Sequence, residues 1–86
     1  MADESNDVAS RVIRVIAKTQ HRDPSTFTAE STFEDMKIDS LDGINIVFAV
    51  EGEFGVDVPD EAMKALRSVR DVIDGVERLL EEKAST

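Results

Sequence analysis

Apolar side chains recur at helical spacing near both ends of the chain. The first segment, up to about Thr19, has its repeat at Val8, Val12, Val15 and Ile16. The second has it at Val69, Val72, Ile73, Val76, Leu79 and Leu80. Both patterns predict amphipathic helices that pack one face on a shared core. The polar residues outside them predict frayed ends at 1–6 and 83–86, with Ser5 or Asn6 capping the first helix.

The stretch from Ser40 to Phe54 predicts a helix with two apolar faces. At about 100° per residue, one arc holds Leu41, Ile44 and Phe48. The other arc holds Ile46, Val47, Val50 and Phe54. We predict that the second arc is core and that the first stays partly open to solvent as a docking surface, because it starts in the first turn beside Ser40. The alternative is a central helix that buries both arcs.

The connecting segments carry turn and capping residues. Pro24 and its polar neighbours end the first helix, and a long loop follows in which four apolar residues, with a single helical turn near 31–36, pin the chain onto the helices. Those residues are Phe27, Phe33, Met36 and Ile38. Gly55 is the expected end of the central helix, and an Asp cap starts a short helix from Asp60 to about Leu66, with Met63 and Leu66 inward. Ser68 and Asp71 resemble a capping box before the last helix.

With 86 residues, the chain predicts one all-α domain, 1–86, with its core at about 8–80. We expect a bundle of three longer helices and one short helix, with a long loop after the first, and no strand. A domain of this size buries only about 60–65% of the surface of its unfolded chain, which disfavours a deep enzymatic cleft.

Charge and composition narrow the function classes. Ten Lys and Arg stand against 19 Asp and Glu, and the net charge of −9 disfavours nucleic acid and anionic lipid while favouring basic protein partners. There is no Cys, so any thiol chemistry must come from an attached group. No apolar run approaches the roughly 18 residues of a membrane span, and the acidic N-terminus is unlike a signal peptide. We expect a cytoplasmic monomer that does not insert into membranes.

The triplet Asp39-Ser40-Leu41 is the main candidate for chemistry. Asp39 can cap the central helix by accepting from the N–H of Leu41 or Asp42, which places the Ser40 hydroxyl in the first turn, facing solvent. A helix start carries roughly +0.5 charge, so an anionic group on Ser40 would be favoured by about 0.3–1 kcal/mol. The ordinary explanation is that serine is common near helix starts.

The wider pattern resembles the acyl carrier protein family over about Val8 to Leu80. The resemblance is carried by Asp39-Ser40-Leu41-Asp42, the apolar helix, Glu51, Phe54 and Val58-Pro59-Asp60-Glu61. It implies that Ser40, flanked by Asp39 and Leu41, carries 4′-phosphopantetheine through a phosphodiester. The terminal thiol of that arm would hold an acyl chain as a thioester, and partner enzymes would do the chemistry, so the chain itself would not be an enzyme.

The resemblance also implies partners and an acyl pocket. The phosphopantetheinyl transferase (holo-acyl carrier protein synthase), ketosynthases and acyltransferases would bind a face that comprises Asp42, Ile44, Phe48, Glu51, Asp57 and Asp60. The acyl chain would be sequestered among Ile46, Val47, Val50, Phe54, Val58, Leu66, Val72 and Val76. Ordinary core packing is the alternative for this second set, and both can hold in a deformable core.

Other functions have weaker support or stay open. Asn45, Gly52 and Lys64 stand where acids are usual in the family, and Met36-Lys37-Ile38 replaces the common Leu-Gly-Ala, which leaves the pathway open. Fatty acid or related lipid synthesis is the first interpretation, and a polyketide or peptidyl carrier is the second. A third is an acidic adaptor without a prosthetic group that binds a basic partner through Leu41, Ile44 and Phe48. Neither a catalytic triad through His21 nor a metal site of EF-hand type fits the spacing.

Overall fold

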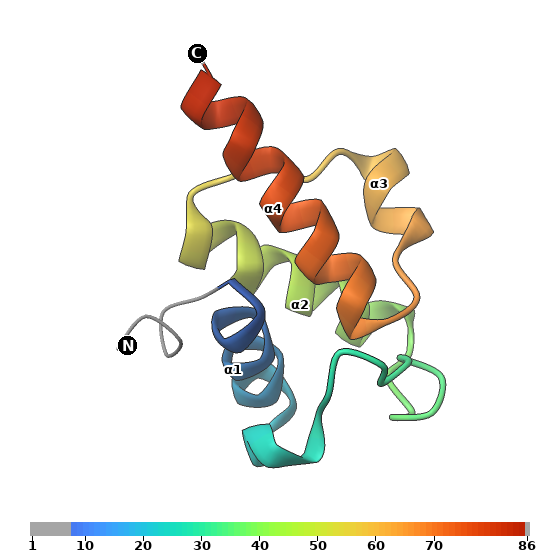
Figure 1. Ribbon diagram of the computed structural model, residues 1–86. Helices are drawn as coiled ribbons and strands as arrows, with labels where there is room; N and C mark the ends of the chain where they lie inside the picture. The colour runs from blue at the N-terminus through green and yellow to red at the C-terminus, as the bar shows by residue number, and fades with distance from the viewer. Residues whose placement is uncertain (1–7, 86) are drawn as a thin grey trace, which may run out of the picture.

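The computed structural model describes residues 8–85, which fold into four α-helices and one 3-10 helix (Figure 1). The elements are α1 (Val8–Gln20), η2 (Pro24–Thr26), α2 (Ser40–Phe54), α3 (Asp60–Ala65) and α4 (Val69–Ser85). The predicted all-α bundle is confirmed, and an isolated bridge between Thr32 and Ser68 is the single β pairing within 8–85. None of the helices in this range is long and apolar enough to cross a bilayer. The predicted cap at Ser5 or Asn6 lies outside the described residues.

The core lies where α1 packs against both α2 and α4. Each of these helices contributes two of the most deeply buried large side chains: Val12, Ile16, Ile46, Val50, Val69 and Val76. The second arc of α2 is therefore core, as predicted, with all four of its side chains buried. No polar or charged residue of the described chain is buried, so the interior is held by apolar contact alone.

The loop between α1 and α2 is fastened to the start of α4. Phe27 and Ile38 are buried, while Phe33 and Met36 are half-buried. The Phe33 N–H donates to the Arg67 carbonyl at 2.9 Å, and the N–H groups of Val69 and Arg70 donate back to the loop. The expected single helical turn is present, because the Met36 N–H donates to the Thr32 carbonyl at 3.1 Å, four residues back, and further hydrogen-bonded turns continue to Ile38. The four apolar side chains thus pin the loop as predicted, with added backbone pairing.

The 3-10 helix η2 was not expected from the sequence. Asp23 caps it, because its carboxylate accepts a hydrogen bond from the Ser25 N–H at 2.9 Å. That backbone hydrogen bond lowers the pKa of the Asp23 carboxyl from its ordinary value of 3.8. The cap therefore stays charged at neutral pH and is lost only when the pH falls through the lowered pKa.

The junctions around α3 differ in detail from the predicted caps. Gly55 ends α2 with φ 67°, as expected, and its N–H donates to the Glu51 carbonyl at 2.8 Å. The expected Asp cap of α3 is wrong: Pro59 is the N-cap, it lacks a side chain that could accept, and Asp60 is already helical. α3 ends at Ala65 and buries none of its residues, since Met63 is only half-buried.

The box before α4 is a variant of the expected one. Ser68 Oγ accepts from the Asp71 N–H at 3.2 Å, as a capping box requires. The Asp71 carboxylate, however, accepts from the N–H of Arg67 at 2.9 Å rather than from the cap residue itself. The two bonds fix the chain direction where it enters α4.

The predicted frayed C-terminal end is wrong for residues 83–85, which are helical. The Lys83 ammonium donates to the Gly55 carbonyl at 2.8 Å and so joins the last turn of α4 to the end of α2. Arg11 makes a second junction, from α1: its guanidinium donates to Glu53 Oε2 at 2.9 and 3.2 Å and lies 4.6 Å from the centre of the Phe54 ring. Both junctions join elements that are far apart in sequence.

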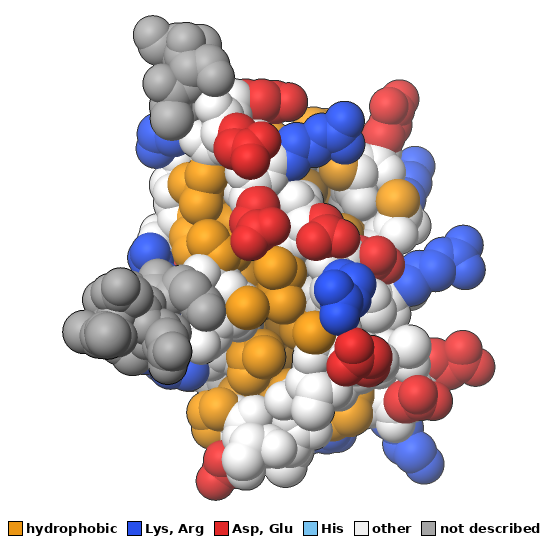
Figure 2. Space-filling model, in the orientation of Figure 1, with side chains coloured by type: hydrophobic (Ala, Val, Ile, Leu, Met, Phe, Trp, Pro, Cys, Tyr) orange, Lys and Arg blue, Asp and Glu red, His pale blue; other side chains and the backbone are white. Residues whose placement is uncertain are grey.

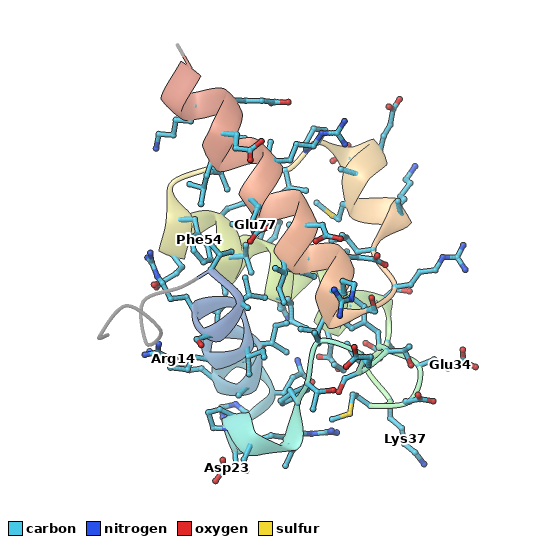
Figure 3. All side chains as sticks on the ribbon, viewed as in Figure 1. Arg14, Asp23, Glu34, Lys37, Phe54 and Glu77 are labelled. Carbon is cyan, nitrogen blue, oxygen red and sulfur yellow. The ribbon has the colours of Figure 1, made fainter. Side chains whose placement is uncertain are left out.

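Lys37 has a left-handed backbone, with φ 60°, three residues before Ser40. A side chain in this region is strained, so we expect Lys37→Gly to raise the free energy of unfolding by about 0.5–1 kcal/mol. Figure 3 shows the Lys37 side chain projecting away from the helices, so little packing would be lost. Urea unfolding of the two proteins would measure the change.

The matched control is Glu34→Gly in the same loop, since Glu34 also projects outward (Figure 3) but does not have a positive φ. Glycine there gains only backbone freedom in the unfolded state and should destabilise the domain. A Lys37→Gly protein as unstable as the Glu34→Gly protein would contradict the strain argument.

Candidate functional site

Ser40 is exposed and is the first residue of α2. Asp39 precedes it in an extended conformation, with φ −87° and ψ −177°, and caps the helix: its Oδ1 accepts from the Asp42 N–H at 2.9 Å. The Asp39 carbonyl accepts from the Gly43 N–H at 2.9 Å. The cap is confirmed at Asp42, one of the two donors that the sequence allowed. These two bonds fix the backbone around Ser40, while the Ser40 side chain stays accessible.

The first turn of α2 suits an ester of phosphoric acid on Ser40. Within residues 8–85 the N–H groups of Ser40 and Leu41 have no hydrogen-bond partner, which leaves two donors and the positive end of a 15-residue helix beside the hydroxyl. A phosphodiester carries a single negative charge, and its two outer oxygens accept hydrogen bonds, which these N–H groups can donate. The residues present therefore suit the phosphodiester through which 4′-phosphopantetheine would be attached at Ser40.

The first arc of α2 forms an exposed apolar strip that starts next to Ser40. The side chains of Leu41, Ile44 and Phe48 are 66%, 38% and 59% exposed. They are the exposed large apolar side chains of the described chain, so the predicted open arc is confirmed and burial of both arcs is wrong. We call these three residues the apolar strip.

The four predicted partner-binding acids differ in their surroundings. Asp57 and Asp60 are exposed in and after the α2–α3 loop, whereas Asp42 and Glu51 are half-buried on α2. One oxygen of Glu51 accepts from the Val58 N–H at 2.8 Å and so holds the α2–α3 loop against α2. Glu51 therefore has a structural role that the sequence did not reveal, because that contact depends on the path of the loop.

A groove of about 870 Å³ opens beside Ser40. Its walls are formed by the α1–α2 loop, the first turns of α2, and α3 together with Leu66 and Arg67, which follow α3. The lining side chains are mostly apolar on the floor and charged at the rim: Thr32, Phe33, Glu34, Ile38, Asp39, Ser40, Gly43, Ile44, Asp60, Met63, Lys64, Leu66 and Arg67. Four of these residues were expected in a site from the sequence, namely Asp39, Ser40, Ile44 and Asp60, and Leu66 was expected in the acyl pocket.

The eight predicted acyl-pocket residues do not surround this groove. Only Leu66 lines it, and Val58 is half-buried in the α2–α3 loop. The other six are buried in the core: Ile46, Val47, Val50, Phe54, Val72 and Val76. Sequestration of an acyl chain among them stays a prediction, and the groove is a second place where an apolar chain attached at Ser40 could lie.

Acidic and basic side chains are not separated on the face of the molecule that carries α4. Figure 2 shows Asp and Glu side chains interspersed with Lys and Arg on the face that carries α4, beside apolar side chains. In the described part of the chain, no three His, Cys, Asp or Glu side chains form a group that could hold a metal ion. The Ser40 hydroxyl is accessible, with the groove and the apolar strip beside it.

The chain is similar to known proteins in both sequence and structure. Residues 10–76 match the family described as phosphopantetheine attachment site. Two relatives named acyl carrier protein, from Rickettsia canadensis and Thermosynechococcus vestitus, are each 37% identical over 70 residues. The match covers 80% of this chain in both cases, and 81% and 86% of the relatives. The crystal structure of an acyl carrier protein from Thermotoga maritima superposes with a TM-score of 0.76 at 33% identity, covering 85% of this chain and 86% of that one.

Proposed function

Because the chain belongs to the acyl carrier protein family, we propose that it carries acyl intermediates on 4′-phosphopantetheine attached to Ser40. The group would supply a thiol, which this chain without Cys lacks, and acyl chains would be held there as thioesters. The pathway is fatty acid or related lipid synthesis. The chain itself catalyses nothing: it presents cargo to enzymes that share the cytoplasm with it.

One observation carries the proposal: Ser40 is the exposed first residue of a capped helix, and it lies at the mouth of a groove with an apolar floor. The hydroxyl can be reached by a large enzyme, since no described element covers it. The groove and the apolar strip begin at the same turn, so cargo and enzyme can both be bound near the attachment point. The unpaired N–H groups of the first turn favour the negative charge that attachment brings.

Partner enzymes would recognise the acids and the apolar strip together. The phosphopantetheinyl transferase, and after it ketosynthases and acyltransferases, would bring Arg and Lys to Asp42, Asp57, Asp60 and the free oxygen of Glu51. Each exposed pair contributes only about 0.2–1 kcal/mol, so the acids mainly speed and orient association. The apolar strip would supply most of the buried area.

The test is modification of the protein by coenzyme A and a broad-specificity phosphopantetheinyl transferase, followed by intact mass measurement. Wild type should gain the mass of one phosphopantetheine, and Ser40→Ala should gain none. Ser25→Ala is the matched control, because Ser25 is also exposed and also lies in the first turn of a helical element after a capping Asp. It should be modified as wild type is. An unmodified wild type, or a modified Ser40→Ala protein, would end the proposal.

The same measurement separates the adaptor alternative, which the exposed apolar strip favours. An adaptor that binds through Leu41, Ile44 and Phe48 would remain unmodified with every transferase and would bind its partner equally well as Ser40→Ala. A polyketide or peptidyl carrier would be modified at Ser40, and would then differ in which acyl or aminoacyl groups its enzymes load.

A further inference from the structure

Two basic side chains, Lys64 and Arg67, line the groove beside Ser40. Both residues are exposed, and within residues 8–85 neither takes part in an ion pair, whereas Arg11 pairs with Glu53 and Arg70 with Glu30. We propose that the enzymes that act on this carrier place carboxylates opposite Lys64 and Arg67, so that their docking surface is mixed in charge instead of uniformly basic. This inference rests on the proposed function of Ser40.

An enzyme that acts at Ser40 must lie over the groove beside it. Ser40, Lys64 and Arg67 line one groove, so an enzyme that reaches the Ser40 hydroxyl covers the rim that holds both cations. A cation that a bound enzyme covers without a carboxylate opposite it loses its hydration and gains no ion pair. A cation that faces a Lys or Arg of the enzyme is repelled. Carboxylates at these two positions remove both penalties. A wholly basic surface incurs them, and the groove therefore selects between partners.

The backbone positions that carry the two cations are defined by the fold. Arg67 has a fixed backbone, because its carbonyl accepts from the Phe33 N–H and its own N–H donates to the Asp71 carboxylate, each at 2.9 Å. Lys64 lies in the last turn of α3. Since these backbone bonds do not involve the Arg67 side chain, its charge can be changed without removing them.

Long-range attraction and local fit then impose different demands on a partner. The net charge of −9 draws basic enzymes from a distance. The groove is lined by three acids, Glu34, Asp39 and Asp60, as well as by the two cations. A partner in contact with the groove therefore meets charges of both signs. The partner that satisfies both is basic overall, with acidic side chains that face the end of α3.

The test is a charge series measured with a holo-acyl-carrier-protein synthase whose docking surface is basic throughout. The values of kcat/KM for modification are compared among wild type, Lys64→Gln/Arg67→Gln and Lys64→Glu/Arg67→Glu. We expect a rise of about threefold for the Gln pair and about tenfold or more for the Glu pair, shrinking as salt is added. The matched control, Lys18→Glu/Arg78→Glu, makes the same change in net charge on exposed positions of α1 and α4 that do not line the groove. It should change kcat/KM less than about twofold.

The outcomes separate this inference from the function itself. Modification of all variants by the broad-specificity transferase, with helical circular dichroism unchanged, shows that Ser40 is an attachment site and that the folds are intact. Equal gains from the groove pair and the control pair would mean that net charge alone matters, and would overturn the inference. So would an unchanged or lower kcat/KM for the groove pair. A wild type modified by neither enzyme would instead overturn the proposed function.

Discussion

Replacing Ile46 by Ala is expected to lower the free energy of unfolding by about 3 kcal/mol. Ile46 is fully buried, on the arc of α2 that faces the core, so truncation loses apolar burial and leaves a cavity that the neighbouring helices fill only in part. A domain of this size is stabilised by only about 5 kcal/mol or slightly more, so the variant would keep less than half of its stability. Urea titration followed by circular dichroism gives the free-energy difference directly.

Ile44→Ala is the matched control, because it makes the same substitution two residues away on the same helix. Ile44 is 38% exposed and belongs to the apolar strip, so its truncation should cost less than about 1 kcal/mol. The contrast between the two variants tests the division of α2 into a buried and an exposed arc. Similar losses for both would mean that the two arcs are equally packed in solution.

That division could be predicted because it depends on local regularities. The helical rotation of about 100° per residue places Ile46 and Ile44 on opposite faces of α2. The preference of Asp for the N-cap and of Gly for a left-handed helix end located the two ends of α2 at Asp39 and Gly55. These rules need only the neighbouring residues. The proposal of Ser40 as the attachment residue rests on the same cap and on the family resemblance, which no argument from spacing could replace.

Contacts between elements far apart in sequence could not be predicted this way. Lys83 lies in a polar C-terminal segment whose sequence alone does not predict a helix. Its ammonium donates to the Gly55 carbonyl, 28 residues away, and this contact helps to hold the last turn of α4 in place. Arg11 and Glu53, 42 residues apart, also pair only because α1 and α2 pack together. The predicted Asp cap of α3 was wrong for a different reason. Asp is a preferred N-cap residue, but the helix starts one residue earlier, so that Pro59 takes the N-cap position and Asp60 is the first helical residue.

The groove beside Ser40 is the part of the candidate site that could not be predicted from the sequence. The family resemblance implied an acyl chain among inward-facing residues, most of them on α2 and α4, and helical periodicity agreed only that these side chains face inward. In the structure these residues fill one another's space, whereas the groove arises where a loop, a helix start and α3 meet. Hollows of this kind depend on how segments are placed relative to one another, which periodicity does not specify.

The second large effect is expected at Phe48, whose ring is 59% exposed on the apolar strip. On the proposed function, Phe48→Ala should lower kcat/KM for modification of Ser40 by about tenfold, the equivalent of about 1.4 kcal/mol, because aromatic anchors supply much of the energy of an interface. The free energy of unfolding should change by less than about 0.5 kcal/mol, since little of the ring is packed in the free protein. Transferase kinetics and urea titration measure the two quantities.

Phe48→Leu separates lost contact area from lost aromatic character, because it keeps most of the apolar surface at the same place. It should retain more than half of the wild-type kcat/KM if area is what the enzyme uses, and its stability should again be that of wild type. Two results would contradict the assignment of the apolar strip as a docking surface. One is an unchanged kcat/KM for Phe48→Ala, and the other is a loss of stability large enough to explain the slower reaction, which would make Phe48 part of the core.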